Sequence, residues 1–221
     1  MSAKNDIAKR LLSMSGKYSA YEVFTDWIRS CAIAIANRCT LVHDKVWNDR
    51  EQLYMDTMRR YNEKEQEYFA EMFVWLGEAL DKEMGDILGE VYMEAEMGSK
   101  TAGQFFTPFH VSELCAKLNL AGTKPDPDGK YRINEPSCGG GGMIIAACKA
   151  LKDQGVNYQR QVDVVAQDLD WKGVYMTYLQ LSLLGISAIV VQGDTLSEPY
   201  IRGRTPKERL LITPMKAGCL L

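Results

Sequence analysis

Hydrophobic residues in the first part of the chain recur at the spacing of helices. One stripe consists of Tyr21, Phe24, Trp27, Ile28, Cys31 and Ile35, and a more regular one of Phe69, Met72, Phe73, Leu76 and Leu80. A hydrophobic residue at every third or fourth position is typical of an amphipathic helix. No proline precedes Gly103, so no residue forces an early break. The pattern predicts about three or four helices within residues 18–98, with the aromatic stripes forming a core.

The pattern changes from residue 103 onward. Thr107-Pro108 is a helix-start signal, with Thr107 as the N-cap and Pro108 at the first helical position. The apolar face predicted for this helix consists of Val111, Leu114, Cys115 and Leu118. Residues 122–129 hold two prolines, two glycines and two aspartates, which predicts a loop after the helix.

Strands and helices then alternate along the chain. Strands are predicted at residues 131–134, 162–166 and 186–191, and helices at residues 143–151 and 171–184. Asp170 is a suitable cap for the second of these helices, and Gly185 a suitable end. Such alternation predicts a parallel sheet with right-handed crossovers, so the fold class is α/β. The expected organisation is a helical domain at residues 1–100 and a Rossmann-like α/β domain at residues 101–221.

The composition is that of an ordinary soluble globular protein, with 221 residues of which 46% are hydrophobic and 25% charged. Polar residues interrupt every apolar run before it reaches the length of a membrane span, and residues 1–10 lack the apolar core of a signal peptide. We therefore expect a cytoplasmic protein with no membrane contact. The six cysteines form no Cys-x-x-Cys pair and only two histidines are present, so we expect reduced thiols and no metal site.

Charge is distributed unevenly although the net charge is only −3. Residues 63–98 carry eleven acidic side chains against two lysines. A nucleic-acid backbone would be repelled by this segment and tolerated by the rest of the chain. The simpler interpretation is that the acids solvate exposed helix faces.

A glycine run follows the first predicted strand of the α/β region. The segment reads Asn134-Glu135-Pro136-Ser137-Cys138-Gly139-Gly140-Gly141-Gly142 and lies between a strand and a helix, where open α/β sheets bind nucleotides. Consecutive glycines let the backbone approach a ligand closely and present amides at a helix N-terminus. The segment lacks the Lys-Ser/Thr pair of a phosphate-binding loop. Glu135 would oppose a pyrophosphate, but it suits a ligand that carries an ammonium or sulfonium.

Acidic side chains follow the next two predicted strands. Gln167-Asp168 ends the second strand, and a carboxylate there can accept hydrogen bonds from both ribose hydroxyls. Gln192-Gly193-Asp194 ends the third strand, and that carboxylate can accept from an exocyclic amine such as that of adenine. Either aspartate alone could be a helix cap. Three successive strands that each end in a suitable polar group favour an adenosine-containing ligand.

These motifs together resemble the N6-adenine DNA methylase family, which includes the modification subunits of type I restriction systems. The family typically reads Gly-Gln-Phe-(Phe/Tyr)-Thr-Pro, then Asp-Pro-Ala-Cys-Gly-Ser-Gly-Gly, then Gln-Glu and Gly-Asp-(Thr/Ser)-Leu. This chain has Gly103-Gln104-Phe105-Phe106-Thr107-Pro108, Glu135-Pro136-Ser137-Cys138-Gly139-Gly140-Gly141-Gly142, Gln167-Asp168 and Gly193-Asp194-Thr195-Leu196. The resemblance is strong over residues 103–196, and it is weak over residues 63–98.

The resemblance implies a class I S-adenosylmethionine (SAM) dependent methyltransferase core, expected to be incomplete at its C-terminal end. In such a core the Thr107-Pro108 turn flanks the methionine of SAM, and the loop from Glu135 to Gly142 wraps the methionine and ribose. Asp168 takes the ribose hydroxyls and Asp194 the adenine amine. The residues implied in cofactor binding are Gln104, Phe106, Thr107, Pro108, Glu135, Pro136, Ser137, Gly139, Asp168, Leu169, Asp194 and Thr195.

One motif of the family is missing from the sequence. The catalytic tetrapeptide Asn-Pro-Pro-(Phe/Tyr) should follow Asp194 at the end of a fourth strand, where it holds and stacks on a flipped adenine. The nearest segment is Leu210-Leu211-Ile212-Thr213-Pro214-Met215, in which Ile212 would replace the amide and Met215 the aromatic ring. Neither residue can perform the same task, so the catalytic residues are unknown from the sequence.

Three hypotheses about function follow. The first is an adenine-N6 DNA methyltransferase that is either completed by another chain or has a catalytic loop evolved beyond recognition. The second is a non-catalytic SAM-binding subunit or regulator, and the third is a methyltransferase for a substrate that needs no aromatic clamp. DNA is the partner that the resemblance implies. The apolar segments Leu210-Leu211-Ile212 and Cys219-Leu220-Leu221 would need cover, so a homo-oligomer or a second methylase or specificity subunit is also expected.

Overall fold

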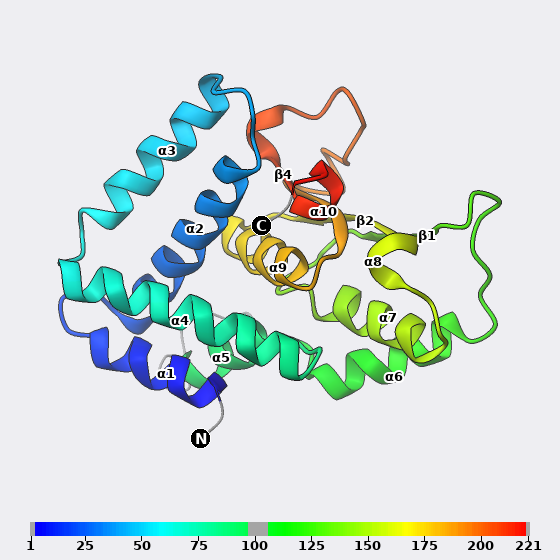
Figure 1. The fold of residues 1–221 in the computed structure, drawn as a ribbon, viewed down its shortest axis with the longest axis horizontal. Coiled ribbons are helices and arrows are strands. Elements are labelled where there is room, and N and C mark those ends of the chain that lie inside the picture. The colour runs from blue at the N-terminus through cyan, green and yellow to red at the C-terminus, as the bar shows by residue number, and fades with distance from the viewer. Residues whose placement is uncertain (1–2, 97–105, 220–221) are drawn as a thin grey trace.

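The computed structural model describes residues 3–96 and 106–219, which form helices around a small sheet (Figure 1). The first part is helical, as predicted. Its helices are α1 (Ala3–Met14), α2 (Ala20–Arg38), α3 (Lys45–Met58), α4 (Glu63–Lys82) and α5 (Ile87–Glu96). The helix α1 was missed by the sequence analysis, although Ile7, Leu11 and Met14 form a buried stripe on it.

Local sequence explains where the longest of these helices begin. Ser19 and Glu22 form a reciprocal capping box at the start of α2, and Asn62 and Glu65 form another at the start of α4. In both boxes the cap side chain and the acidic side chain satisfy backbone amides that have no partner within the helix. The acids Glu22 and Glu65 therefore have structural roles at helix N-termini.

The second part contains four strands and the helices between them. They are α6 (Phe109–Leu120), β1 (Tyr131–Glu135), α7 (Gly142–Asp153), α8 (Tyr158–Gln161), β2 (Val162–Asp168), α9 (Trp171–Leu183), β3 (Ser187–Gln192), a 3-10 turn (Lys207–Arg209), β4 (Leu210–Ile212) and α10 (Pro214–Ala217). The sheet order is β1-β2-β3-β4. The first three strands are parallel, so the α/β fold class and the predicted parallel sheet are confirmed.

The strand β4 differs from the other three in direction. It pairs antiparallel with β3, so that Leu210 lies opposite Val191 and Ile212 opposite Ile189. Leu211 faces the core and is 1% exposed. The sequence analysis expected the segment Leu210-Leu211-Ile212 to need cover from another chain. Leu211 is instead covered within this chain, while Ile212 is 42% exposed.

The helix α9 lies at the centre of the molecule. Its residues from Lys172 to Ser182 are all buried, because β2 and β3 lie on one side while α2, α4 and α5 pack on the others. A helix that is enclosed in this way needs few exposed polar residues, which accounts for its mostly apolar sequence. The helical first part and the sheet therefore share one continuous core. The domain boundary predicted near residue 100 falls outside the described residues and stays a prediction.

The helix α6 corrects two details of the sequence analysis. It begins at Phe109 with Pro108 as its N-cap, so Thr107 is not the cap. Its small residues Ser112 and Ala116 are buried against α7, where Ala146 and Ala150 allow a close approach. The predicted face was wrong, because Val111, Leu114 and Leu118 are 38%, 59% and 71% exposed. Cys115, on the same predicted face, is half-buried.

Candidate functional site

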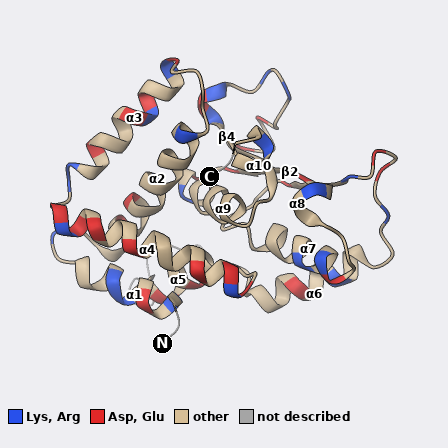
Figure 2. Ribbon diagram, viewed as in Figure 1, with Lys and Arg blue, Asp and Glu red and all other residues tan. Residues whose placement is uncertain are grey.

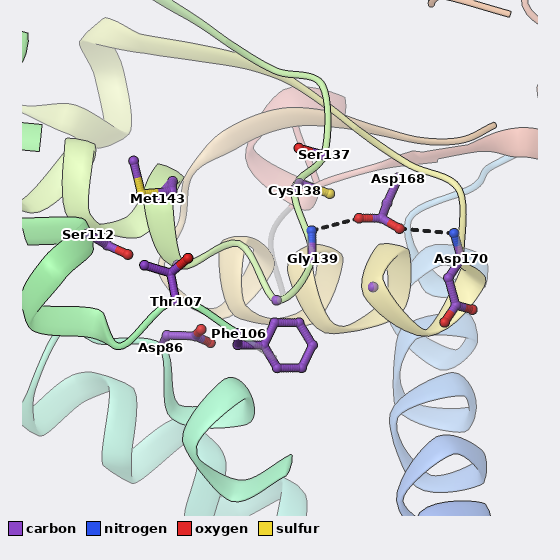
Figure 3. A pocket seen from close by; sticks show the side chains of 13 residues that line it. Asp86, Phe106, Thr107, Ser112, Ser137, Cys138, Gly139, Met143, Asp168 and Asp170 are labelled. Carbon is purple, nitrogen blue, oxygen red and sulfur yellow. Dashed lines mark hydrogen bonds between the residues drawn. The ribbon is translucent and has the colours of Figure 1, made fainter. Parts of the chain in front are cut away.

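The carboxyl ends of β1, β2 and β3 meet at one edge of the sheet, beside a cavity of about 360 Å³. Backbone hydrogen bonds join the segments that follow β1 and β3 to the end of β2. The amide of Cys138 donates to the carbonyl of Gln167, and that of Gly193 to the carbonyl of Asp168, each at 2.9 Å. The cavity is lined by Asp86, Phe106, Thr107, Ser112, Ser137, Cys138, Gly139, Gly140, Gly142, Met143, Asp168, Asp170 and Gly173 (Figure 3).

Each position from Gly139 to Gly142 requires glycine for a physical reason. Gly139 and Gly141 adopt positive φ angles of +51° and +90°, a conformation that costs other residues energy. A Cβ on Gly140 would lie 3.1 Å from Oδ1 of Asp86, and one on Gly142 would lie 2.9 Å from Oδ2 of the same residue. The run therefore lets the chain turn into α7 while packing directly against a carboxylate.

Asp168 holds the glycine loop in place. Its Oδ2 accepts a hydrogen bond from the amide of Gly139 at 2.8 Å, and its Oδ1 accepts from the amide of Asp170 at 2.9 Å. Each carboxylate oxygen can accept more than one hydrogen bond, so Asp168 keeps acceptor capacity toward the cavity. Thr177 of α9 donates to the carbonyl of Gly139 from the opposite side at 2.9 Å.

Asp86 is a residue of this site that the sequence analysis did not single out. It precedes α5 in the helical part and is 4% exposed. Its Oδ1 accepts from the amide of Gly89 at 2.9 Å and from Nε2 of Gln180 at 2.8 Å. Burial raises the pKa of this carboxyl, and the two hydrogen bonds oppose that shift only in part. In the sequence Asp86 was one of eleven acids in a segment interpreted as solvated.

Gln180 connects Asp86 to the glycine loop. Its Nε2 donates both to Asp86 and to the carbonyl of Gly140 at 2.7 Å, while its Oε1 accepts from the amide of Leu88 at 3.0 Å. All polar atoms of this fully buried amide are paired, as buried amides require. The cavity wall is thus built jointly by the helical part and the sheet part.

The cavity is anionic. Asp86, Asp168 and Asp170 line it, and its lining includes no lysine or arginine from the described residues. Burial raises the pKa of Cys138 to about 12, so this thiol adds no charge near neutral pH. A phosphate-rich ligand would be repelled here, whereas a ligand with a positive charge and hydrogen-bond donors would be attracted.

Comparison with known proteins gives the family. Residues 83–213 match the family model described as N-6 DNA Methylase, which is more than half of the chain. The chain belongs to the N-6 DNA methylase family. The resemblance noted in the sequence is therefore confirmed.

Two solved structures are similar to this N-6 DNA methylase family member, and the first supports its fold. A structure from Listeria monocytogenes, assigned as a class I S-adenosylmethionine-dependent methyltransferase, has 13% identity and a TM-score of 0.52, and the match covers 90% of this chain and 55% of that one. A type I restriction-modification system methyltransferase subunit from Streptococcus thermophilus has 13% identity and a TM-score of 0.47, with 91% and 59% covered. The chain therefore spans little more than half the length of these two proteins.

Five of the residues expected to bind the cofactor line the cavity. They are Phe106, Thr107, Ser137, Gly139 and Asp168. Figure 3 shows Thr107 and Ser112 on one side of the glycine loop and Asp168 with Asp170 on the other. Phe106 contacts the loop directly, because a Cβ on Gly139 would lie 3.1 Å from its ring.

The other expected residues lie outside the lining of this cavity or cannot be placed. Gln104 lies outside the described residues. Pro108, Glu135, Pro136, Leu169, Asp194 and Thr195 are described but do not line the cavity. Thr195 donates to the carbonyl of Pro136 at 2.6 Å, so the third strand end lies beside the glycine loop.

Two acidic residues that lie outside the cavity lining, Asp194 and Glu135, form local hydrogen bonds. Asp194 accepts from the amide of Leu196 and from the hydroxyl of Ser197, which lower the pKa of its carboxyl. Glu135 is half-buried at the end of β1, and burial raises its pKa although the amide of Ser137 donates to it at 3.3 Å.

The segment Ile212-Thr213-Pro214-Met215 does not reach the site. Because β4 runs antiparallel, its end lies beside the start of β3, at the edge of the sheet opposite the cavity. Thr213 is fully buried there, donating to the carbonyl of Ile186 at 2.8 Å and accepting from the amide of Ala188 at 2.9 Å. The segment that the sequence offered as the nearest counterpart of the catalytic motif therefore lies away from the cavity.

The described residues contain no cluster of three or more His, Cys, Asp or Glu side chains that could hold a metal ion. None of the described helices is long and apolar enough to cross a membrane.

Proposed function

We propose that the chain binds SAM in the anionic cavity at the carboxyl edge of the sheet. The observation that carries this proposal is the combination of a glycine loop at the start of α7 with a cavity lining that has aspartates and, among the described residues, no lysine or arginine. SAM carries an ammonium and a sulfonium, and only one carboxylate opposes them. Its adenosine offers hydroxyl and amino donors. Such a ligand suits a wall of carboxylates and backbone groups better than a nucleotide phosphate does.

The proposed arrangement follows the two sides of the glycine loop. Asp168 accepts from the ribose hydroxyls, while Phe106, Thr107, Ser137 and Gly139 contact the rest of the ligand. Asp194 is proposed for the adenine amine, since Gly193 is bonded to Asp168 and the adenine would extend past the cavity toward β3. Gln104, Pro108, Glu135, Pro136, Leu169 and Thr195 complete the proposed set at the rim.

Membership of the N-6 DNA methylase family supports the transfer of a methyl group to adenine N6 in DNA as the reaction in which this chain takes part. The sequence has no Asn-Pro-Pro-(Phe/Tyr) segment, and the nearest substitute lies at the opposite edge of the sheet. We therefore propose that a second chain supplies the residues that hold the target base, as in a modification complex with DNA as substrate.

A specific observation favours a second candidate, a SAM-binding pseudo-methyltransferase that acts as a subunit or regulator. The chain has the features proposed for cofactor binding, but among the described residues no side-chain amide with a following aromatic extends from a fourth strand end over the cavity. Transfer measured with and without a companion methylase subunit separates the two candidates. Only the first candidate predicts that adding the subunit gives methyl incorporation into DNA. It also predicts that this incorporation depends on an intact Asp168.

Calorimetric titration with SAM and S-adenosylhomocysteine tests the core of the proposal. We expect one site per chain with a dissociation constant in the micromolar range, corresponding to about −8 kcal/mol. ATP and NAD serve as controls and should not bind, because their phosphates would face Asp86 and Asp168. Tight binding of ATP in preference to both adenosyl compounds would overturn the proposal.

We also propose association of the chain with a second copy or with another methylase or specificity subunit. The outer face of the sheet is only partly covered among the described residues, with Ile212 exposed beside the half-buried Ile189. Parallel sheets in stable proteins are usually covered on both faces. Sedimentation at low micromolar concentration should give a mass above that of the monomer. A stable monomer would contradict this expectation.

A further inference from the structure

We propose that Asp86 and Ser112 form a subsite for the amino-acid end of the bound ligand, with Asp86 accepting from its α-ammonium. This inference rests on the proposed function, because it assigns one end of the SAM molecule to one end of the same cavity. Asp86 belongs to the helical part of the chain, and no motif of the resemblance includes it.

The two oxygens of Asp86 have different surroundings. Both donors that reach this side chain, the amide of Gly89 and Nε2 of Gln180, bind Oδ1. Among the described residues no donor is bonded to Oδ2, which packs against the position of Gly142, where a Cβ would lie 2.9 Å away. One oxygen therefore accepts both hydrogen bonds, and the other has no bonded donor among the described residues on a side chain that lines the cavity.

The available oxygen belongs to a carboxylate that has no counter-ion among the described residues. Asp86 is 4% exposed and forms no ion pair among the described residues. Among the described residues, Glu90 of α5 lies near it and Asp168 and Asp170 line the same cavity, and all three have the same sign. A buried charge of this kind is costly unless a cation pairs with it. The α-ammonium of the ligand can supply the cation that the described residues do not provide.

Ser112 supplies an independent indication of a ligand at the same end. Its side chain is 0% exposed, and its Oγ has no hydrogen-bond partner although it lies on the cavity wall. Buried hydroxyls are rarely left unpaired in native proteins. A donor here, near the exposed hydroxyl of Thr107, can bind the carboxylate of an amino acid whose ammonium is held by Asp86 (Figure 3).

Chemistry decides which end of SAM fits this subsite. The ribose and adenine carry neutral donors, and the sulfonium carries a charge but no N–H. The α-ammonium alone combines a full positive charge with hydrogen-bond donors, and it stands beside a carboxylate that can accept from Ser112. Asp168, whose oxygens are already bonded to two loop amides, suits the neutral hydroxyls at the other end.

The variant Asp86→Asn tests the assignment with little structural change. An asparagine can keep Oδ1, and with it both hydrogen bonds to Gly89 and Gln180, while its amide nitrogen replaces Oδ2. Calorimetry should compare S-adenosylhomocysteine with 5′-methylthioadenosine, which has the same adenosine and sulfur but no amino-acid end. We expect the variant to lose on the order of 10- to 100-fold in affinity for the first compound, because a charge-assisted hydrogen bond is lost. For the second compound we expect a change of less than about 3-fold.

Two further variants complete the test. Ser112→Ala should also weaken S-adenosylhomocysteine more than 5′-methylthioadenosine. It should leave the melting temperature of the ligand-free chain unchanged or higher, since it removes an unpaired buried hydroxyl. Asp170→Asn is the matched control, because it neutralises a cavity carboxylate that instead caps α9 through the amide of Lys172. It should affect both compounds alike.

The possible outcomes separate the two proposals. If the wild-type chain binds both compounds and Asp86→Asn weakens both equally or neither, the subsite is wrong while the cofactor site stands. If Asp86→Asn does not fold, equal effects of Ser112→Ala on both compounds overturn the subsite in the same way. A wild-type chain that binds neither compound overturns the proposed function itself.

Discussion

A carboxylate buried without a cation should lower the stability of the chain that contains it. Because burial raises the pKa of Asp86, the folded chain binds the proton of the Asp86 carboxyl more tightly than the unfolded chain does. The contribution of Asp86 to the free energy of unfolding is therefore fully present below the unfolded pKa of about 4, and it is lost as the pH rises through the folded value. Ligand-free protein at neutral pH should carry this penalty.

Denaturant unfolding of the ligand-free wild type and Asp86→Asn at several pH values measures the effect. We expect the free energy of unfolding of the variant, relative to wild type, to increase as the pH rises from about 4 to 7. The surrounding acids Glu90, Asp168 and Asp170 are common to both proteins, so the difference isolates Asp86. A difference that does not change with pH would show that the pKa of Asp86 is the same in the folded and the unfolded chain.

The two strand-end aspartates should differ in their importance. Asp168 lines the cavity, whereas both oxygens of Asp194 are used in a local turn with Leu196 and Ser197. We expect Asp168→Ala to weaken SAM binding by about 1.5–3 kcal/mol, the usual cost of one charge-assisted hydrogen bond. Asp194→Ala should weaken it less. Calorimetry checks both values, and wild-type affinity in both variants would remove the aspartates from the site.

The glycine loop before α7 is tightly constrained by its backbone angles and its neighbours. Gly141→Ala would force a Cβ to within 3.1 Å of the Thr177 hydroxyl at a φ of +90°. We expect it to lower the free energy of unfolding by about 1–3 kcal/mol and to weaken SAM binding. Gly77→Ala in α4 meets no atom within 4 Å, and it should raise stability by about 0.5–1 kcal/mol. Urea unfolding of both variants is the measurement, and a stable Gly141→Ala protein would contradict the assigned strain.

The helix α6 shows why a helical pattern does not identify the buried face. Its large side chains Val111, Leu114 and Leu118 point outward, while Ser112 and Ala116 allow close contact with α7. Hydrophobicity alone ranks these residues in the wrong order. Backbones approach most closely where side chains are small, and this preference depends on the partner helix rather than on the sequence of α6 itself.

Other elements were predictable because local chemistry determines them. The strands β1 to β3, the loop at residues 122–129, the cap at Asp170 and the stop at Gly185 all follow from adjacent residues. The direction of β4 does not, because a strand of three residues can pair either way and its long preceding loop permits both. Asp86 could not be found from its neighbours, since its role arises from Gln180 and Gly142, more than fifty residues away.

At the scale of the whole molecule, the chain alone should not methylate adenine in DNA at a useful rate. The loss of one preorganised hydrogen-bonding group costs about a hundredfold to a thousandfold in rate, and the loss of a stacking aromatic costs roughly 1–3 kcal/mol of base binding. The only segment resembling the catalytic motif lies across the sheet, where Thr213 is buried. Tritiated methyl transfer from SAM to unmethylated duplex and single-stranded DNA tests this expectation. Robust turnover by the purified chain, unaffected by Pro214→Ala, would mean that another segment performs catalysis.

Positively charged side chains that could contact a DNA backbone occupy a limited part of the surface. Figure 2 shows lysines and arginines along the loop before β4, whereas α4 carries acidic residues. Within this loop Arg209 pairs with Glu198, and beyond β4 Lys216 pairs with Asp163. These pairs reduce the charge available to a phosphate backbone, which agrees with a tail that faces a partner or solvent rather than DNA.

The bridge made by Gln180 also has a consequence for how quickly the protein loses its structure. Its three hydrogen bonds join residues 92, 94 and 40 positions apart along the chain. Contacts between such distant segments require the closure of large loops, so we expect them to form after the folding transition state. Stabilising a late-forming contact slows unfolding and leaves the folding rate nearly unchanged. A ligand held at this bridge would therefore prolong the lifetime of the folded chain without helping a newly made chain to fold.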